Sequence, residues 1–208
     1  MPRPRDFDSA DVLNSVTDVF TAHGYAGTSV SMLVEHTGLG KQSLYNSFGD
    51  KQNLYLKALD RAVDRMACVQ DAMRVAKTGG EAIKIFFEAV FTGCLSNAPE
   101  HQNCIVSGGL MEGVEDAEIH EKLYACWNAT KDLLARYVKA GQLDGSIRMD
   151  MQSDDIAISL MTIMSGLRVT ARVVKSKETL QKIIQNGLCT FWMMKEGSEN
   201  TRSQESRP

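Results

Sequence analysis

The segment Thr28–Lys51 constrains the fold of this 208-residue chain more than any other part of the sequence. Apolar residues recur at helical spacing after Ser29, which can cap a helix by accepting a backbone N–H, and again over Lys41–Phe48. The sequence Thr-Gly-Leu-Gly at positions 37–40 separates the two patterns, and glycine reaches the positive-φ geometry that a sharp turn between helices needs. The spacing predicts a helix-turn-helix followed by a further helix.

The second helix of this motif, Lys41–Phe48, has one apolar and one polar face. Leu44 and Phe48 lie four residues apart, so both point toward a core, where Leu33 and Phe20 are also expected. The outward positions carry amides, hydroxyls and one cation, which suit hydrogen bonds to base edges and phosphate groups. These outward residues are Lys41, Gln42, Ser43, Tyr45, Asn46 and Ser47. The pattern favours double-stranded DNA as a partner.

Two parts of this region together resemble the TetR family of transcriptional regulators. The predicted first helix, Ala10–His23, leads into Thr28-Ser29-Val30 as in that family. The block Gly38–Leu54 is similar to the family's recognition helix and the start of its fourth helix. The resemblance covers roughly the first third of the chain. One residue departs from it: Gly40 stands where the family usually has serine or threonine, so a weaker cap of the recognition helix is expected.

The resemblance implies an all-α fold with two domains. A three-helix helix-turn-helix DNA-binding domain is expected over residues 6–52, and a helical ligand-binding and dimerisation domain over residues 53–195. A polar tail, 196–208, is expected to be disordered. The implied function is that of a ligand-responsive repressor that binds a pseudo-palindromic operator as a homodimer. A ligand would move the fourth helix as a lever and so change the spacing of the recognition helices.

The candidate DNA contacts fall into two groups. Gln42 and Ser43 lie on the N-terminal half of the recognition helix, which enters the major groove in helix-turn-helix proteins, so they are candidates for base readout. Tyr45 resembles the family's phosphate-contacting tyrosine, with packing at the turn as the alternative, and Asn46 suits either a base or a phosphate. The other candidates are expected at phosphates: Arg3, Arg5, Thr28, Ser29, Lys41 and Lys51.

The charge and composition of the whole chain limit how such binding works. A formal net charge of −3 and a pI near 5.8 predict weak non-specific affinity for DNA, so two subunits are needed to supply enough phosphate contacts. No apolar run approaches the roughly 20 residues of a membrane span, and no signal peptide is evident. Five cysteines without paired spacing fit a reducing compartment. A cytoplasmic protein without a membrane partner is expected.

The remainder of the chain also has helical periodicity, with no convincing alternating strand. One long fourth helix is expected from Asp50 to about Thr78, as a connector between two lobes. Gly141 is expected to stop the helix that begins at Asp116. The other expected helices span residues 81–96, 104–112, 153–174 and 177–194.

The last two predicted helices are apolar over more than one face, which exceeds what a one-sided surface helix needs. The spare face is expected to meet a second subunit, with packing inside one core as the alternative. The family resemblance implies a four-helix interface made by these helices from both subunits. Its candidate residues are Ile156, Leu160, Ile163, Leu167, Leu180, Ile184, Leu188 and Phe191.

The resemblance also implies a cavity for a small effector in the larger lobe. Eleven methionines and several aromatic residues suit the wall of an adaptable apolar cavity, although core filling explains them equally well. The candidate lining residues are Phe86, Phe87, Cys104, Met111, Trp127, Met161 and Met164. A small apolar or electrophilic effector is expected there.

Cys104 opens a segment similar to one in which some TetR subfamilies carry a sensor cysteine. A reactive thiolate needs a cationic or helix-N-terminal setting, which His101 could help to supply, whereas a buried cysteine is usually a small hydrophobe. A redox or electrophile sensor at Cys104 is therefore an alternative to a non-covalent effector site. The other cysteines lie on apolar stripes and are expected to pack: Cys68, Cys94, Cys126 and Cys189.

Catalytic and metal-binding motifs are not evident. Ser107 precedes two glycines but lacks the glycine two residues before it that a nucleophile elbow has, and no phosphate loop, dinucleotide fingerprint or His-Glu-x-x-His motif occurs. The set Cys94, His101, Cys104 and His120 matches no zinc spacing. No enzyme activity, cofactor or metal is expected. A helical enzyme and a DNA-silent adaptor are the remaining alternatives, and the polar face of the recognition helix argues against the adaptor.

Overall fold

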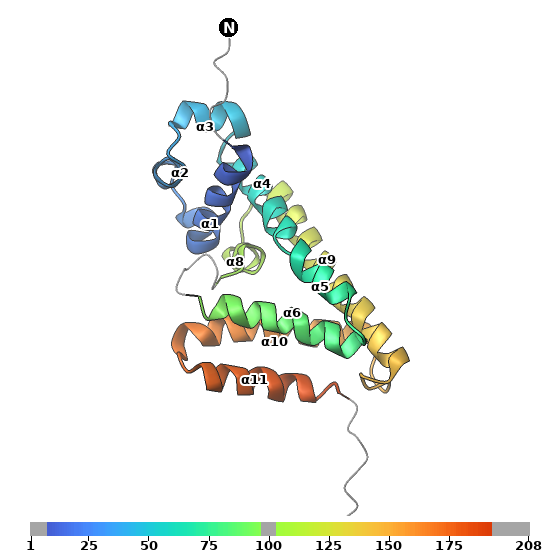
Figure 1. The fold of residues 1–208 in the computed structure, drawn as a ribbon. Coiled ribbons are helices and arrows are strands. Elements are labelled where there is room, and N and C mark those ends of the chain that lie inside the picture. Colours follow the sequence, from blue (N-terminus) through green and yellow to red (C-terminus); the bar gives the residue numbers. More distant parts are fainter. Residues whose placement is uncertain (1–7, 97–102, 193–208) are drawn as a thin grey trace, which may run out of the picture.

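A computed structural model describes residues 8–96 and 103–192 of the chain (Figure 1). Within these ranges all regular secondary structure is α-helical, apart from an isolated β-bridge between Ile147 and Trp192. The all-α prediction is confirmed. The helices are α1 (Ser9–Gly27), α2 (Val30–Thr37), α3 (Lys41–Phe48), α4 (Lys51–Asp64), α5 (Ala67–Arg74), α6 (Gly79–Cys94), α8 (Ile105–Glu112), α9 (Ala117–Asp144), α10 (Ser153–Val173) and α11 (Lys177–Cys189).

Two buried hydrophobic clusters define two lobes (Figure 1). The first cluster lies among α1 to α4, α8 and the first half of α9. The second lies among α5, α6, the second half of α9, α10 and α11. The long helix α9 contributes Ile119 and Leu123 to the first cluster and Leu134 and Val138 to the second. It therefore joins both lobes. The domain boundary expected at residue 52 stays a prediction.

The helix-turn-helix forms over α2 and α3, where the sequence predicts it. The Ser29 hydroxyl oxygen accepts the Met32 backbone N–H at 3.2 Å and so caps α2. Gly38 ends α2 with a φ of 68°, a left-handed conformation that glycine adopts without steric cost. Leu33 of α2 and Leu44 of α3 are fully buried. Local signals in the sequence therefore suffice to place both helices on the first core.

The predicted single fourth helix is wrong, because the chain breaks after Asp64 into α4 and α5. At the break the Met66 N–H donates to the Val63 carbonyl oxygen at 3.0 Å, three residues back instead of four. No glycine or proline marks this position. Arg65 is instead held by α1, where its guanidinium donates to the Asp18 carboxylate at 2.6 Å. The break coincides with a tertiary contact that helical periodicity cannot indicate.

Gly141 does not stop α9, contrary to the prediction. The helix continues to Asp144 and ends at Gly145. Gly141 lies where the start of α6 crosses α9: a Cβ atom on Gly79 would lie 2.2 Å from the Gly141 nitrogen and from the Tyr137 carbonyl oxygen. Glycine at position 79 is therefore required for the close approach of the two helix backbones.

Two other helix ends differ from the sequence-based expectation. α1 continues to Gly27, with a break at Gly24. α11 ends at Cys189, short of the predicted end at position 194. Beyond it Phe191 is buried, and its carbonyl oxygen accepts the Arg148 N–H at 2.9 Å. This backbone contact takes over from the helical hydrogen bonds and fixes the end of the described chain beside the turn after α9.

α10 is long and apolar enough to cross a membrane by length and composition, so the expectation that no such run exists is wrong. The helix packs against α6, α9 and α11 in the second hydrophobic cluster. Its residues Ile156, Leu160 and Leu167 are buried there. Because the core helix of a soluble protein passes the same test, the packing identifies α10 as a core helix of the larger lobe.

Candidate DNA-binding surface and effector cavity

The predicted recognition helix α3 lies at one end of the molecule (Figure 1). Leu44 and Phe48 are buried and hold the helix on the core. Gln42 and Asn46 are exposed one turn apart, and the Gln42 amide nitrogen donates to the Asn46 amide oxygen at 2.9 Å. The two amides lie side by side, where each can turn to a base edge. Gly40 precedes the helix without a side-chain cap, as the sequence predicts.

Two lysines contribute positive charge at this end of the molecule, and each ammonium group lies near an aromatic ring. Lys41 is exposed, and its Nζ is 5.7 Å from the centre of the half-buried Tyr45 ring. Lys51, at the start of α4, has its Nζ 4.6 Å from the centre of the Tyr25 ring. Cation–π attraction of this kind positions a charge without neutralising it. We call the residues Lys41, Gln42, Ser43, Tyr45 and Asn46 the α3 surface.

Thr28 does not belong to an exposed DNA-contacting surface, contrary to the prediction. It is 1% exposed, and its hydroxyl donates to the Gly24 carbonyl oxygen at 2.6 Å, across the break in α1. Ser29 is exposed, but its hydroxyl oxygen caps α2. Arg3 and Arg5 lie outside the described residues, as does the predicted tail 196–208.

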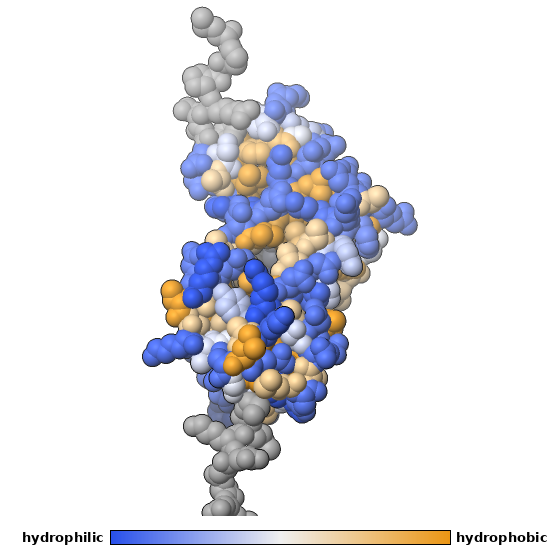
Figure 2. All heavy atoms as spheres, turned by 90° about the vertical axis from the view of Figure 1, so that its right-hand side faces the viewer, coloured by the Kyte–Doolittle hydropathy of each residue, from blue (hydrophilic) through white to orange (hydrophobic). Residues whose placement is uncertain are grey.

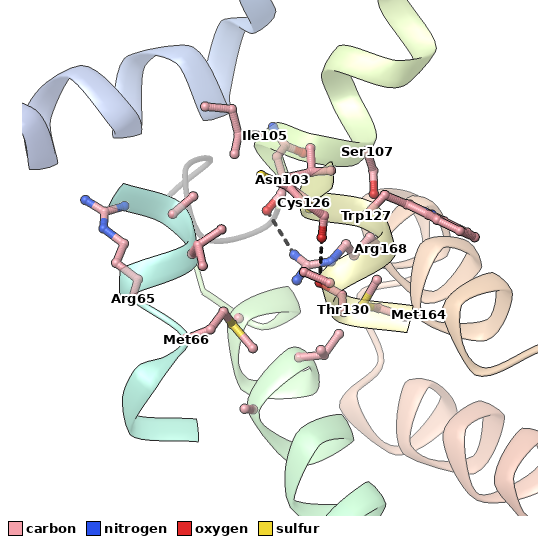
Figure 3. A pocket seen from close by; sticks show the side chains of 18 of the residues that line it. Arg65, Met66, Asn103, Ile105, Ser107, Cys126, Trp127, Thr130, Met164 and Arg168 are labelled. Atoms are coloured by element: carbon pink, nitrogen blue, oxygen red, sulfur yellow. Dashed lines mark hydrogen bonds between the residues drawn. The ribbon is translucent and has the colours of Figure 1, made fainter. Parts of the chain in front are cut away.

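A cavity of about 340 Å³ lies between the two lobes (Figure 3). Its wall includes residues of α1, α4, α5, α6, α8, α9 and α10. Five of the seven predicted lining residues meet there: Phe86, Cys104, Trp127, Met161 and Met164. The structure therefore brings together side chains that are far apart in the sequence, on the side of the larger lobe that faces α1.

Phe87 and Met111 do not line this cavity, so both are removed from the candidate set. Phe87 follows Phe86 on α6 and points about 100° further around the helix, into the second core. Met111, near the end of α8, is 82% exposed and lines an adjoining hollow beside Gly24 and Glu112, which shares Asn103 and Arg168 with the cavity wall.

Arg168 is a lining residue that the sequence reasoning missed. Figure 3 shows this α10 side chain directed toward Asn103, with Thr130 beside it. Its Nη1 donates to the Asn103 carbonyl oxygen at 2.9 Å. Its Nε is buried and has no hydrogen-bond partner among the described residues. An arginine inside a long apolar helix was the available signal, because charged side chains are seldom buried without a partner.

The cysteines around the cavity differ in exposure. Cys104 is half-buried, precedes α8 as its N-cap residue and lines the cavity. Burial raises the pKa of the Cys126 thiol, which also lines the cavity, and that of the Cys94 thiol, so both favour the unreactive protonated form. Cys68 and Cys189 are exposed, contrary to the expectation that they pack. Among the described residues no cluster of His, Cys, Asp or Glu suits a metal ion.

The residues predicted for a dimer interface lie mostly inside the core of one chain. Seven are at most 8% exposed: Ile156, Leu160, Leu167, Leu180, Ile184, Leu188 and Phe191. α10 buries this face against α6 and α9, and α11 buries its own against α6 and α10. Ile163 is half-buried and lies close to Gly187 of α11. For the seven buried residues the predicted contact with a second subunit is therefore wrong, whereas for Ile163 it stays a prediction.

The outer faces of α10 and α11 carry exposed apolar side chains. Ile158, Val169 and Val173 of α10 are 45%, 59% and 83% exposed, and Ile183 of α11 is 36% exposed. By contrast, the right-hand side of the molecule in Figure 1, turned to the viewer in Figure 2, is mostly hydrophilic, with apolar side chains in small separate groups. An exposed apolar strip on one helix is the more typical sign of a contact surface.

Comparison with known proteins assigns the chain to a family. Residues 13–58 match the bacterial regulatory proteins of the tetR family. The chain is 36% identical over 188 residues to the uncharacterized HTH-type transcriptional regulator YezE of Bacillus subtilis (strain 168), a match that covers 87% of this chain and 94% of YezE. The chain belongs to the TetR family. It is also 27% identical over 184 residues to the HTH-type transcriptional repressor ComR of Escherichia coli (strain K12), with 87% of each chain covered.

A solved structure agrees with the TetR assignment. The TetR-family regulator CifR, a cysteine mutant in complex with 26-base-pair double-strand operator DNA, matches this fold with a TM-score of 0.78 and 25% identity. The match covers 90% of this chain and 98% of CifR. This TetR-family chain is therefore a DNA-binding transcriptional regulator, and family membership excludes the enzyme alternative.

Proposed function

We propose that this TetR-family regulator is a cytoplasmic, ligand-responsive repressor that binds a pseudo-palindromic operator as a homodimer. The α3 surface carries the proposal: the exposed Gln42 and Asn46 amides lie beside exposed Lys41 and Ser43, on a helix that buried Leu44 anchors. A firmly anchored helix with outward amides suits base readout in a major groove. The repressor ComR and the operator-bound CifR support this reading by similarity.

Binding as a pair follows from the charge of the chain. Lys41 belongs to the α3 surface and Lys51 starts the next helix, while the whole chain has a formal net charge of −3. Affinity for DNA grows with the number of phosphates that cations neutralise. Two subunits double these contacts and place two α3 helices in successive major grooves, about one helical turn apart. The expected target is an operator with two-fold symmetry.

The outer face of α10 is the proposed centre of the dimer interface. Ile158, Val169 and Val173 recur on one side of this helix, and exposed Thr162 and Gly166 lie between them. Burial of this strip removes apolar surface from water in both subunits. The small side chains at the two intervening positions let a second helix approach closely. The proposed interface also includes Ile183 on the exposed face of α11.

The cavity supports a response to a ligand, because its wall includes both α1 and the break between α4 and α5. The Arg61 Nε donates to the Asn14 side chain of α1 at 2.8 Å, and Arg65 donates to Asp18 at 2.6 Å. α1 and the end of α4 are thus tied together. An effector that favours one arrangement of the cavity shifts both helices, and with them the spacing of the two α3 surfaces.

A covalent effector at Cys104 is the second candidate, because this half-buried cysteine lines the same cavity. His101, the residue expected to assist it, lies outside the described residues. With an activated alkene, the Cys104 Sγ would form a bond to one alkene carbon as the C=C π bond breaks, and the other carbon would take up the thiol proton through solvent. Mass spectrometry after limited treatment with N-ethylmaleimide distinguishes the candidates. Labelling of Cys104 that abolishes operator binding favours the sensor, and labelling confined to exposed Cys68 and Cys189 excludes it.

One charge on the proposed interface tests the homodimer. Val169→Asp places a carboxylate on the outer face of α10, and Val75→Asp places one at a position that is 82% exposed, between α5 and α6. By sedimentation, wild type and Val75→Asp should be dimers, and Val169→Asp should be monomeric. Loss of the pair should weaken binding to an inverted-repeat operator by at least about a hundredfold. A dimeric Val169→Asp protein would contradict the interface, and a monomeric wild type would contradict the homodimer.

A further inference from the structure

The charged residues that line the cavity are of one sign. Arg65 and Arg168 contribute to its wall, and none of the described lining residues is an aspartate or a glutamate. The whole chain has a formal net charge of −3, so this positive charge is a local property of the cavity. An anionic ligand meets no like charge in the described wall, whereas a cationic ligand meets two.

The two arginines differ in how their charge is balanced. Arg65 donates to the Asp18 carboxylate at 2.6 Å and to the Asn14 side chain at 3.2 Å. Arg168 pairs with no described carboxylate: its Nη1 donates to the Asn103 carbonyl oxygen at 2.9 Å, and its buried Nε has no partner among the described residues. A buried donor without an acceptor is costly, and a ligand with a negative oxygen would offset that cost.

We propose that the effector is an apolar monocarboxylic acid whose carboxylate binds Arg168. This inference rests on the proposed ligand-responsive function and names the chemical class of its ligand. A planar guanidinium matches a carboxylate through two parallel N–H···O bonds, a stronger arrangement than a single bond to a neutral carbonyl. The apolar body of the acid lies among Phe86, Trp127, Met161 and Met164, whose side chains accommodate alkyl or aryl groups.

Asn103 connects Arg168 to the DNA-binding lobe. Its carbonyl oxygen accepts from Arg168, its side-chain oxygen accepts from Arg172, and its amide nitrogen donates to the Thr21 carbonyl oxygen of α1 at 3.2 Å. A carboxylate that binds Nε and Nη2 draws the guanidinium toward the cavity and so lengthens the Nη1 bond to the Asn103 carbonyl oxygen. Binding of the acid therefore weakens the link from α10 to α1 and disfavours the operator-bound arrangement.

The C-terminal end of α8 also contacts α1. The Glu112 carboxylate accepts the Tyr25 backbone N–H at 2.8 Å and the Ala26 backbone N–H at 3.3 Å. α1 in turn packs against α2 of the helix-turn-helix. A displacement at Asn103, just before α8, thus reaches the DNA-binding lobe through contacts at both ends of one short helix.

Calorimetric titration of the full-length protein without DNA tests the ligand class. The probes are octanoate and 4-phenylbutyrate, each compared with its neutral amide, octanamide and 4-phenylbutanamide. Wild type should bind each acid at least about tenfold more tightly than the matched amide. Arg168→Gln should abolish this preference, and Arg168→Lys, which keeps the charge but not the planar fork, should retain only part of it. The control Arg136→Gln alters an exposed arginine of α9 outside the cavity and should leave the preference unchanged.

Operator binding by fluorescence anisotropy on the same samples separates this inference from the proposed function. Either acid should weaken operator binding by wild type at least about tenfold and have no such effect on Arg168→Gln. Any of three results would overturn the inference. Wild type could bind acids and amides equally, or Arg168→Gln could keep the preference for acids. Alternatively, no saturated acid from butanoate to dodecanoate could bind to wild type. If operator binding is intact in those cases, only the ligand class is wrong. If wild type binds no operator, the proposed function is contradicted as well. Thermal unfolding verifies that both Arg168 variants fold.

Discussion

The α3 surface and the cavity differ in how the chain builds them. The α3 surface comes from one contiguous stretch, Lys41–Asn46, whose orientation is set by buried Leu44 on the same helix. The cavity wall combines residues as distant in sequence as Thr17 and Arg168. A local pattern specifies the first, and only the packing of the two lobes specifies the second. Mutations should therefore separate recognition of DNA from the stability and ligand response of the larger lobe.

The largest expected effect is on the packing of the larger lobe. Gly79→Ala would place a Cβ atom 2.2 Å from backbone atoms of Tyr137 and Gly141, which cannot move aside as a flexible side chain can. We expect a loss of about 3 kcal/mol in the free energy of unfolding, measured with denaturant. Gly108→Ala on α8 is the control, because open space surrounds its Cβ position, and should gain about 0.5 kcal/mol. Equal stabilities for the two variants would show that the α6–α9 crossing is not tight.

A change confined to the α3 surface should alter recognition without altering stability. Gln42→Ala removes an exposed amide that faces Asn46, so discrimination at one base pair should fall by about 1–3 kcal/mol. Lys41→Ala should instead weaken binding to all duplexes similarly and reduce the salt dependence by about one phosphate contact. Competition anisotropy with single-base operator variants measures both effects. Unchanged discrimination in Gln42→Ala would remove this residue from base readout.

The ion pair between α1 and the end of α4 should contribute a smaller amount to stability. Arg65→Gln removes the ion pair with Asp18 of α1, whose side chains are 33% and 36% exposed. For such partly exposed groups we expect a loss of about 1 kcal/mol in the free energy of unfolding. Arg74→Gln, which breaks the more exposed pair with Asp71, should have an effect near zero. If both variants lose the same stability, the link between α1 and the end of α4 has no special role.

The smallest effect is a pH dependence at the start of α4. The Asn53 backbone N–H and side-chain amide donate to the Asp50 carboxylate and hold its pKa below the ordinary value of 3.8. This contribution to stability is fully present above the pKa of the unfolded chain and is lost as pH falls through the lower pKa of the folded state. Asp50→Asn keeps an N-cap acceptor but does not titrate. The Tm advantage of wild type over Asp50→Asn at neutral pH should therefore shrink in acid, and a constant difference would contradict this assignment.

The sequence predicts those structural features that depend on residues close together in the chain. Ser29, Gly38 and the spacing of Leu44 and Phe48 place α2 and α3, because caps, turns and amphipathic spacing act within a few residues. Prediction fails where packing decides. Gly141 is a glycine, the residue type that commonly ends a helix, but it lies within α9, at the crossing with α6.

The candidate sites show the same limit. Apolar positions on α10 and α11 predict buried faces, but not whether the partner is the same chain or another; Leu160 and Leu188 are buried in one chain. Phe86 and Phe87 are adjacent residues of the same type, and only the orientation of α6 in the fold places Phe86 at the cavity. The sequence suggests that the Thr28 hydroxyl lies on the surface. In the fold it donates to the Gly24 carbonyl oxygen, which the break in α1 leaves available.

The most direct test asks whether two α3 surfaces recognise an operator with two-fold symmetry. Wild type and Gln42→Ala each select bound fragments from a genomic DNA pool at the same moderate salt concentration. Wild type should enrich an inverted repeat whose half-sites are centred about 10 base pairs or a multiple apart, and Gln42→Ala should enrich the same repeat with a relaxed preference at one position of each half-site. Absence of any enriched repeat for a folded, dimeric wild type would contradict this function.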